Sequence, residues 1–283
     1  MKSPTIGVLH PGDMGSTVAA SARANGLRVL WASEERSPQT RERAAAAGLE
    51  DAKTLASLCA ASDVILSVCP PHSALDLARL VAAHGFSGIY VDANAVSPGT
   101  AGDIGRVIEH GGATFVDGGI IGPPARALGT TRLYLSGEQA GGIARLFAQG
   151  PLEAIPMAGK PGAASALKMA YAAYTKGTAA LLVSIRALAI RAGVDQALLG
   201  EWALSQKDLA ARSERAAGET ARKAWRFTGE MTEIAATFDD AGLPDGFFRA
   251  AGEIYEALAG HKDAPDMPSM AEVAKALAGR PRD

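Results

Sequence analysis

The sequence has few of the residues that build metal centres or disulfide frameworks. It contains two cysteines, Cys59 and Cys69, and five scattered histidines, and none of them has a spacing typical of metal ligands. We therefore expect no bound metal and no structural disulfide. A reducing, cytoplasmic location is the expected compartment, because no signal peptide precedes the first predicted strand at Thr5.

The chain also lacks a large excess of one charge and a long uninterrupted apolar run. Its formal net charge is −2, which gives no electrostatic reason to expect nucleic acid or an anionic membrane as a partner. The most apolar stretch, 179–190, is interrupted by Arg186, which argues against a membrane span. The expected partner is a small-molecule substrate.

What the sequence does contain is a regular alternation of strand and helix patterns, followed by helix patterns alone. The 283 residues suffice for two domains of ordinary size. We predict an α/β fold with a Rossmann-type doubly wound sheet at 1–160. A long interdomain helix at 161–193 and an all-α C-terminal domain for substrate binding and dimerisation at 194–283 are predicted to follow.

The predicted long helix runs from Pro161 to Ala192. Pro161 suits a first turn, and Gly193 suits a left-handed C-terminal cap. Its apolar residues go nearly all the way round, so neighbours should bury most of its sides, and we expect a homodimer to bury the excess. Lys168 is the unusual residue, a cation among Ala, Leu and Met near the start.

A glycine-bearing turn separates the first predicted strand, Thr5 to Leu9, from the helix that follows. This order is typical of a dinucleotide-binding unit, in which the helix N-terminus offers N–H groups to the phosphates. Gly12 would let the backbone approach a pyrophosphate, and Gly15 would let the helix pack closely on the strand. The predicted cofactor contacts of this turn are His10, Pro11, Gly12, Asp13, Met14 and Gly15. His10 replaces the first glycine of the usual motif, and an ordinary strand–helix turn is the alternative.

The end of the second predicted strand bears on the choice between NADP and NAD. No acid stands at the strand end after Trp31, whereas Ser33 and Arg36 are near. A hydroxyl and a guanidinium can bind a 2′-phosphate, so the sequence favours NADP. The alternative is that Glu34 or Glu35 binds an unphosphorylated ribose, which would select NAD.

Two further loops leave the carboxyl ends of predicted parallel strands, where open α/β sheets bind ligands. The first contains Val68, Cys69 and Pro70, which we predict to contact the cofactor. The second contains Asn94, a candidate contact for the nicotinamide or the substrate, with an ordinary turn asparagine as the alternative.

Four blocks in order resemble the β-hydroxyacid dehydrogenase superfamily, relatives of 3-hydroxyisobutyrate and 6-phosphogluconate dehydrogenases. These blocks are GVLHPGDMG, VDANAVSP, FVDGGIIGPPARALGTTRLYLSG and GAASALKMAY. The resemblance implies a nicotinamide cofactor, a substrate loop at Ile121, Gly122 and Pro123, and a catalytic lysine at Lys168. The C-terminal stretch is similar to a less-characterised branch of the superfamily.

Departures from the family pattern fall near the predicted site. Asn94 and Ala95 replace a Ser-Thr pair, and Ile121 and Pro123 replace Ser and Gly in the substrate loop. Tyr171 and Ala172 stand where the family has two asparagines, so Tyr171 is predicted to take over the hydrogen bond that orients the lysine. The string DGGI is similar instead to imine reductases, which generally lack the lysine.

Lys168 suits general acid–base chemistry, because burial disfavours its charged form and brings its pKa toward working pH. Tyr171 lies three residues further, on the same helix face. In the C-terminal domain, Arg226 and Glu230 are four residues apart on one helix face, a spacing that allows them to pair, and both are candidate substrate contacts.

We therefore predict an NAD(P)-dependent oxidoreductase that transfers hydride between the nicotinamide and a small β-hydroxyacid-like or polyhydroxylated acid. Lys168 is the predicted proton donor and acceptor. The alternatives are an imine reductase and a non-catalytic NADPH-binding module.

Overall fold

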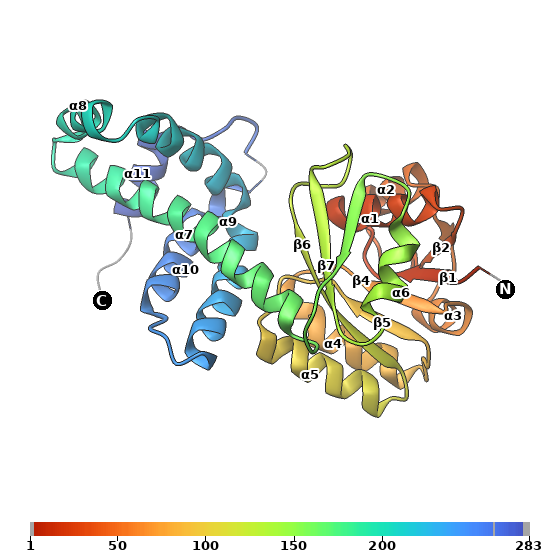
Figure 1. Cartoon of the computed structure of the whole chain (residues 1–283). Helices are drawn as coiled ribbons and strands as arrows, with labels where there is room; N and C mark the ends of the chain where they lie inside the picture. The colour runs from red at the N-terminus through yellow and green to blue at the C-terminus, as the bar shows by residue number, and fades with distance from the viewer. Residues whose placement is uncertain (1–2, 263, 280–283) are drawn as a thin grey trace. The chain divides into compact units, whose positions relative to one another are not determined.

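The computed structural model describes residues 3–262 and 264–279 of the chain (Figure 1). These residues divide into a first unit that ends at Met169 and a second unit that begins at Ala170. The division falls inside helix α7 (Ala163–Arg191), which belongs to the predicted interdomain segment. The two units are described separately.

The first unit is built on one sheet of eight strands in the order β3-β2-β1-β4-β5-β6-β7-β8. Strand β7 is antiparallel to β6, and every other neighbouring pair is parallel. The crossover from β3 back to β4, beside β1, makes the sheet doubly wound. The predicted fold class, with a Rossmann-type first domain followed by helices, is confirmed. The strands are β1 (Thr5–Val8), β2 (Arg28–Trp31), β3 (Glu50–Asp51), β4 (Val64–Ser67), β5 (Ile89–Asp92), β6 (Thr114–Ile121), β7 (Thr131–Ser136) and β8 (Leu152–Pro156).

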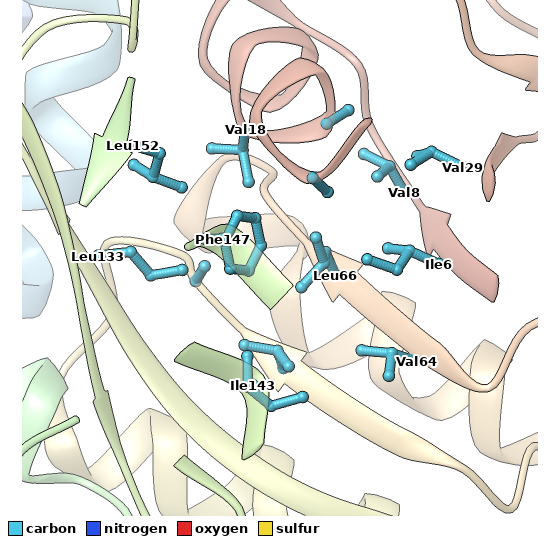
Figure 2. Packing of buried hydrophobic residues seen from close by; sticks show 14 of the residues in the cluster. Ile6, Val8, Val18, Val29, Val64, Leu66, Leu133, Ile143, Phe147 and Leu152 are labelled. Atoms are coloured by element: carbon cyan, nitrogen blue, oxygen red, sulfur yellow. The ribbon is translucent and has the colours of Figure 1, made fainter. Parts of the chain in front are cut away.

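Helices cover both faces of this sheet, and the strand residues alternate between two apolar clusters. Val64 and Leu66 of β4 face one cluster, whereas Ile65 faces the other. Figure 2 shows the first cluster, in which Val18 of α1 and Phe147 of the short helix η1 lie against the strands. The continuous apolar run of β4 follows from this two-sided burial. The helices of this unit are α1 (Asp13–Ala24), α2 (Pro38–Ala46), α3 (Leu55–Ala61), α4 (Pro71–Ala83), α5 (Pro98–His110), α6 (Ala140–Ala144) and η1 (Arg145–Phe147).

Hydroxyl side chains cap several of these helices. Ser37, Thr54 and Ser97 each accept a hydrogen bond from a backbone N–H in the first turn of α2, α3 and α5. The cap at Ser37 starts α2 at Pro38. Proline at the first helical position supports this start.

Helix α7 begins at Ala163, two residues after the predicted start, because Gly162 before it has a φ of 101° that no helix accommodates. At the other end, Gly193 adopts a φ of 72°, as expected for a left-handed C-terminal cap.

The second unit continues α7 and is otherwise helical among its described residues. Tyr255 on α10 donates its hydroxyl hydrogen to the carbonyl oxygen of Lys176 on α7 at 2.7 Å. The last helix starts with a capping box, formed by Ser269 and Glu272. The remaining elements are α8 (Asp195–Ser205), α9 (Leu209–Asp240), α10 (Gly246–Leu258), η2 (Ala259–His261) and α11 (Met270–Ala278).

Neither a membrane-spanning helix nor a cluster of metal ligands occurs among the described residues. Within 3–262 and 264–279, no helix has the length and apolar character needed to cross a membrane. The same residues hold no cluster of three or more histidine, cysteine or acidic side chains arranged for a metal ion.

Candidate functional site

The register of the parallel strands brings the predicted cofactor loops to one edge of the sheet. Leu66 of β4 pairs with Val8 of β1, and Ser67 pairs with Asp92 of β5. Asp92 in turn pairs with Asp117 of β6, which continues for four residues past that pair. The loops after β1, β4 and β5 therefore leave the sheet side by side, at its carboxyl edge.

The loop after β1 has the geometry that a pyrophosphate needs. Gly12 is the N-cap residue of α1, and no side chain in the described part of the chain caps the helix there. Its first N–H groups are therefore available to an anion. A Cβ at Gly15 would lie 2.0 Å from the carbonyl oxygen of His10, so only glycine lets the helix start this close to the strand. The loop fits a dinucleotide.

His10 and Arg36 form a buried contact beside this loop. Nη1 of Arg36 lies 2.7 Å from Nε2 of His10, so the ring nitrogen accepts from the guanidinium. Burial, reinforced by the charge of Arg36, lowers the pKa of His10 to about 4. Nδ1 of His10 and Nε of Arg36 are buried without a hydrogen-bond partner among the described residues. These orphaned polar atoms fit a site that receives a polar ligand.

The Ser33 hydroxyl makes its hydrogen bond within the protein. Its side chain is buried and forms a hydrogen bond with Asp51 of β3, whose backbone is in register with Trp31. Burial raises the pKa of Asp51, but hydrogen bonds from Lys53 and Ser33 outweigh this effect and bring the pKa to about 2. The role of Ser33 at a 2′-phosphate stays a prediction, and Arg36 is the better placed of the two predicted groups.

Asn94 is buried and holds the two neighbouring loops together. Its Oδ1 accepts a hydrogen bond from the backbone N–H of Cys69 at 2.6 Å, and its Nδ2 donates to Oγ of Ser67 at 3.0 Å and to Asp92. The amide group thus fixes the loop that carries Val68, Cys69 and Pro70. Contact of Asn94 with the nicotinamide or substrate stays a prediction, because both of its amide hydrogens are used within the protein.

The Cys69 side chain lies in the same loop and is a thiol at neutral pH. Burial, followed in size by the nearby charge of Asp92, raises the pKa of Cys69 to about 12. A thiol with such a pKa is a poor nucleophile, so Cys69 acts as part of the loop surface.

The loop after β6 turns back onto the start of α1. Gly122 has a φ of 126°, and a Cβ there would lie 2.3 Å from the carbonyl oxygen of Thr130. The backbone N–H of Ala125 donates to Oγ1 of Thr17 at 3.0 Å, and Arg126 pairs with Asp13 at 2.6 Å. These contacts bring the predicted substrate loop beside the predicted cofactor loop. Within it, Ile121 is buried, whereas Gly122 and Pro123 are exposed.

The start of α7 is fixed to β6 by a buried carboxylate. Oδ2 of Asp117 accepts hydrogen bonds from the backbone N–H groups of Gly162, Ala164 and Ser165 at 2.9 to 3.0 Å. The same carboxylate accepts from the hydroxyls of Ser136 at 2.8 Å and Ser165 at 2.6 Å. A negative charge at a helix N-terminus satisfies the free N–H groups and the helix dipole.

Lys168 lies against the same strand. A Cβ at Gly119 of β6 would lie 2.7 Å from the carbonyl oxygen of Ala164 and 2.9 Å from Cβ of Lys168. The absence of a side chain at Gly119 therefore allows the first turns of α7 to approach β6. Since Gly119 follows Asp117, which is in register with the last residue of β5, Lys168 stands at the carboxyl edge of the sheet. Its side chain is half-buried.

The remaining predicted site residues belong to the second unit. Tyr171 on α7 is 47% exposed, and Arg226 on α9 is also exposed. Glu230 is buried and pairs with Lys176 of α7 at 2.9 Å. The spacing of Arg226 and Glu230 gave no indication of this lysine, because Lys176 reaches α9 from another helix.

Sequence reasoning missed the roles of Asp117, Gly119 and Lys176. Asp117 did carry a signal, because it is an acid within an otherwise apolar strand, FVDGGII, and such an acid needs buried partners. Gly119 gave no signal of its own, since a glycine in a strand indicates close approach without saying of what.

Two families match successive parts of the chain. The NAD binding domain of 6-phosphogluconate dehydrogenase matches residues 5–144, and a domain of unknown function (DUF1932) matches residues 189–258. The first match shows that the loop after β1 belongs to a nicotinamide-cofactor domain.

Relatives and solved structures agree with these matches. An uncharacterized 28.5 kDa protein of Methanothermus fervidus is 34% identical over 69% of this chain and 74% of its own length. A conserved hypothetical protein from Sinorhizobium meliloti is 27% identical over 98% of this chain and 96% of that one, with a TM-score of 0.69. A 3-hydroxyisobutyrate dehydrogenase from Mycobacterium tuberculosis, solved with L-serine, shares the fold with a TM-score of 0.71, at 18% identity over 98% of this chain and 99% of that one.

Proposed function

Because this chain belongs to the β-hydroxyacid dehydrogenase superfamily, we propose that it is an NAD(P)-dependent oxidoreductase acting on a small β-hydroxyacid-like or polyhydroxylated acid. The observation that carries the proposal is the position of Lys168. It lies at the carboxyl edge of the sheet because Gly119 has no side chain to keep the helix away. The nicotinamide, when bound, accepts or supplies the hydride.

The cofactor would be held by groups of the first unit. The N–H groups at the start of α1 would bind the pyrophosphate, and Gly12 and Gly15 leave that surface without side chains. Arg36 carries a guanidinium beside the same loop, with Nε free of protein partners in the described chain. A guanidinium binds a phosphate with two parallel hydrogen bonds, which supports a preference for NADP.

Lys168 would move the proton that accompanies the hydride. In the oxidising direction its neutral amine accepts the hydroxyl proton while the carbon loses hydride and the carbonyl forms. In the reducing direction the ammonium donates a proton to the carbonyl oxygen as the carbon gains hydride. The ammonium form also attracts an acidic group on the substrate. Tyr171, three residues further on α7, is proposed to orient the amine.

Replacing Lys168 by methionine tests the proposal. Methionine keeps the length of the side chain and removes the proton donor, so kcat should fall by about 10²- to 10⁴-fold while the affinity for NADPH is unchanged. Lys160→Met, an exposed lysine that precedes α7, is the matched control and should keep full turnover. Undiminished turnover of Lys168→Met on a substrate of the wild-type protein would refute the role of the amine.

Imine reduction is the second candidate function. Its support is the D-G-G-I string of β6, which resembles that of imine reductases and forms the surface next to Lys168. Assays with a cyclic imine and with a panel of hydroxyacids separate the two reactions. Tight NADPH binding with no turnover of either class would instead favour the non-catalytic module.

We also propose that the chain forms a homodimer through α7. Tyr174, Leu181 and Leu188 are exposed large apolar side chains at seven-residue intervals, so they share one face of the helix. A second copy is the proposed cover for this stripe. Light scattering should give twice the chain mass for the wild type and a monomer for Leu181→Glu with Leu188→Glu. A monomeric wild type would contradict the dimer without affecting the proposed reaction.

A further inference from the structure

A cavity of about 390 Å³ lies in the second unit, and none of the residues assigned above to cofactor binding or proton transfer lines it. Its walls come from α7, α9 and α10. Helix α7 contributes Thr175, Thr178 and Leu182, and Tyr255 of α10 closes one side. The volume suits a small organic molecule.

Three cations from α9 line this cavity, and they outnumber the acidic groups of its lining. Arg212, Arg215 and Lys223 all line it, and in the described part of the chain none of the three forms an ion pair. Glu219 is the acid in the lining, so the three cations leave a net positive charge. Exposed helix faces more often mix both signs, and three unpaired cations around one hollow attract an anion.

Lys176 is a fourth cation in the lining, but its charge is already balanced. It pairs with Glu230 at 2.9 Å, and both side chains are largely buried. Its ammonium also lies 5.0 Å from the ring centroid of Phe227. Lys176 is therefore a structural part of the cavity wall, and the three unpaired cations of α9 are the groups available to a ligand.

The rest of the lining is apolar or carries hydroxyl groups. Leu182, Ala179 and Phe227 offer apolar surface, and Thr178 offers a hydroxyl. Inorganic ions gain nothing from apolar surface, whereas an organic acid buries its carbon body there and places its charged group among the cations.

We propose that this cavity is a binding site for a small organic anion, a carboxylate or a phosphate monoester whose carbon body packs on Phe227 and Leu182. Arg212, Arg215 and Lys223 hold the anionic group. All the residues concerned lie in the second unit and none takes part in the proposed hydride transfer, so the site stands or falls separately from the reaction.

Calorimetric titration of the full-length protein, without cofactor, tests the site. The probes are phenyl phosphate, phenylacetate, inorganic phosphate and the uncharged benzyl alcohol. Saturable binding of phenyl phosphate or phenylacetate is expected, and the tighter of the two identifies the preferred acid. Arg215→Gln with Lys223→Gln should weaken that binding at least tenfold.

Two further variants distinguish binding in the cavity from a general effect of the protein's net charge. Arg191→Gln together with Arg222→Gln removes two exposed cations of the second unit that do not line the cavity, and it should change the affinity less than twofold. Ala216→Phe should abolish binding by filling the space, without any change of charge. Thermal melting of each variant checks that the unit remains folded.

Several results would overturn the proposal. Absence of saturable binding up to about 10 mM ligand, roughly tenfold above a weak Kd of about 1 mM, is one. Equal binding of benzyl alcohol would show that charge has no role, and equal binding of inorganic phosphate would show that the apolar wall has none. An equal loss in the Arg191→Gln, Arg222→Gln control would indicate an unspecific effect of net charge.

Discussion

Asp117 of β6 holds Ser165 of α7 twice, accepting the backbone N–H at 3.0 Å and the side-chain hydroxyl at 2.6 Å. The carboxylate is fully buried. Because Lys168 follows Ser165 by three residues on the same helix, this contact fixes the position of the helical turn that carries the Lys168 side chain. The link joins a strand of the sheet to the residue that the proposed chemistry requires.

Removing that carboxylate should destabilise the protein strongly. Asp117→Ala leaves the N–H groups of Gly162 and Ser165 buried without acceptors and leaves that of Ala164 with only the Ser136 hydroxyl, at an expected cost of about 4 kcal/mol in the free energy of unfolding. Asp117→Asn keeps an acceptor oxygen and should cost about 2 kcal/mol. Urea unfolding measures both. Asp103→Ala removes an exposed carboxylate of α5 and is expected to cost less than about 0.5 kcal/mol; an equal loss in all variants would contradict the anchoring role.

Adding one methyl group at Gly119 should displace α7. The new Cβ would lie 2.7 Å from the carbonyl oxygen of Ala164, which is backbone and cannot rotate away. We expect Gly119→Ala to cost about 1–3 kcal/mol and to lower kcat through misplacement of Lys168. Gly102→Ala on α5 is the control, because its nearest neighbour is the end of a flexible arginine at 3.9 Å. That variant should be neutral or slightly stabilising, and a Gly119→Ala protein with unchanged kcat would contradict the proposed packing.

His10 should make the folded state sensitive to mild acid. Its pKa is about 4 in the fold and 6.5 when exposed, so between these values the unfolded chain binds more protons. The free energy of unfolding therefore falls as pH decreases from 6.5 to 4, by on the order of 3 kcal/mol. The measurement is urea unfolding at pH 7.5, 5.5 and 4.5, without cofactor.

The matched variant for this effect is His10→Gln, which keeps an acceptor for Arg36 and has no titrating ring. Carboxylates titrate alike in both proteins, so the difference between the two curves isolates the histidine. Parallel curves over this range would show that His10 is not buried in its neutral form.

Arg36 should control the preference for the phosphorylated cofactor. We expect Arg36→Gln to raise the Kd of NADPH at least tenfold, because a charge-assisted bidentate contact is lost, and to change the Kd of NADH little. Fluorescence titration gives both constants. Arg43→Gln, an exposed arginine in the last turn of α2, is the control and should leave both unchanged. Equal weakening of NADPH and NADH in Arg36→Gln would assign the guanidinium to the shared pyrophosphate.

The predicted cofactor turn shows which parts of the site can be predicted from residues that are neighbours in sequence. The order of strand, glycine-bearing turn and helix around Gly12 and Gly15 predicts the loop after β1, because each step depends on residues adjacent in sequence. The substitution of His10 for the usual glycine could be seen but not interpreted. Its partner, Arg36, is 26 residues away and meets it only because β1 and β2 are neighbours.

The pairing of Glu230 depends on tertiary structure. Its spacing from Arg226 on one helix face allows a local pair, but it gives no indication that Lys176 of α7 reaches the carboxylate. Spacing along a helix identifies neighbours on that helix and says nothing of side chains that arrive from another.

By itself, the sequence determined the alternation of strands and helices, the cofactor turn, the long helix with its capping glycine and the lysine near its start, since these depend on local propensity and periodicity. Tertiary structure alone decided which groups those features meet: Asp117 with the N-terminus of α7, Gly119 with Lys168, and three cations around one cavity. Such contacts join residues distant in the chain, and the register of the sheet and the packing of helices bring them together.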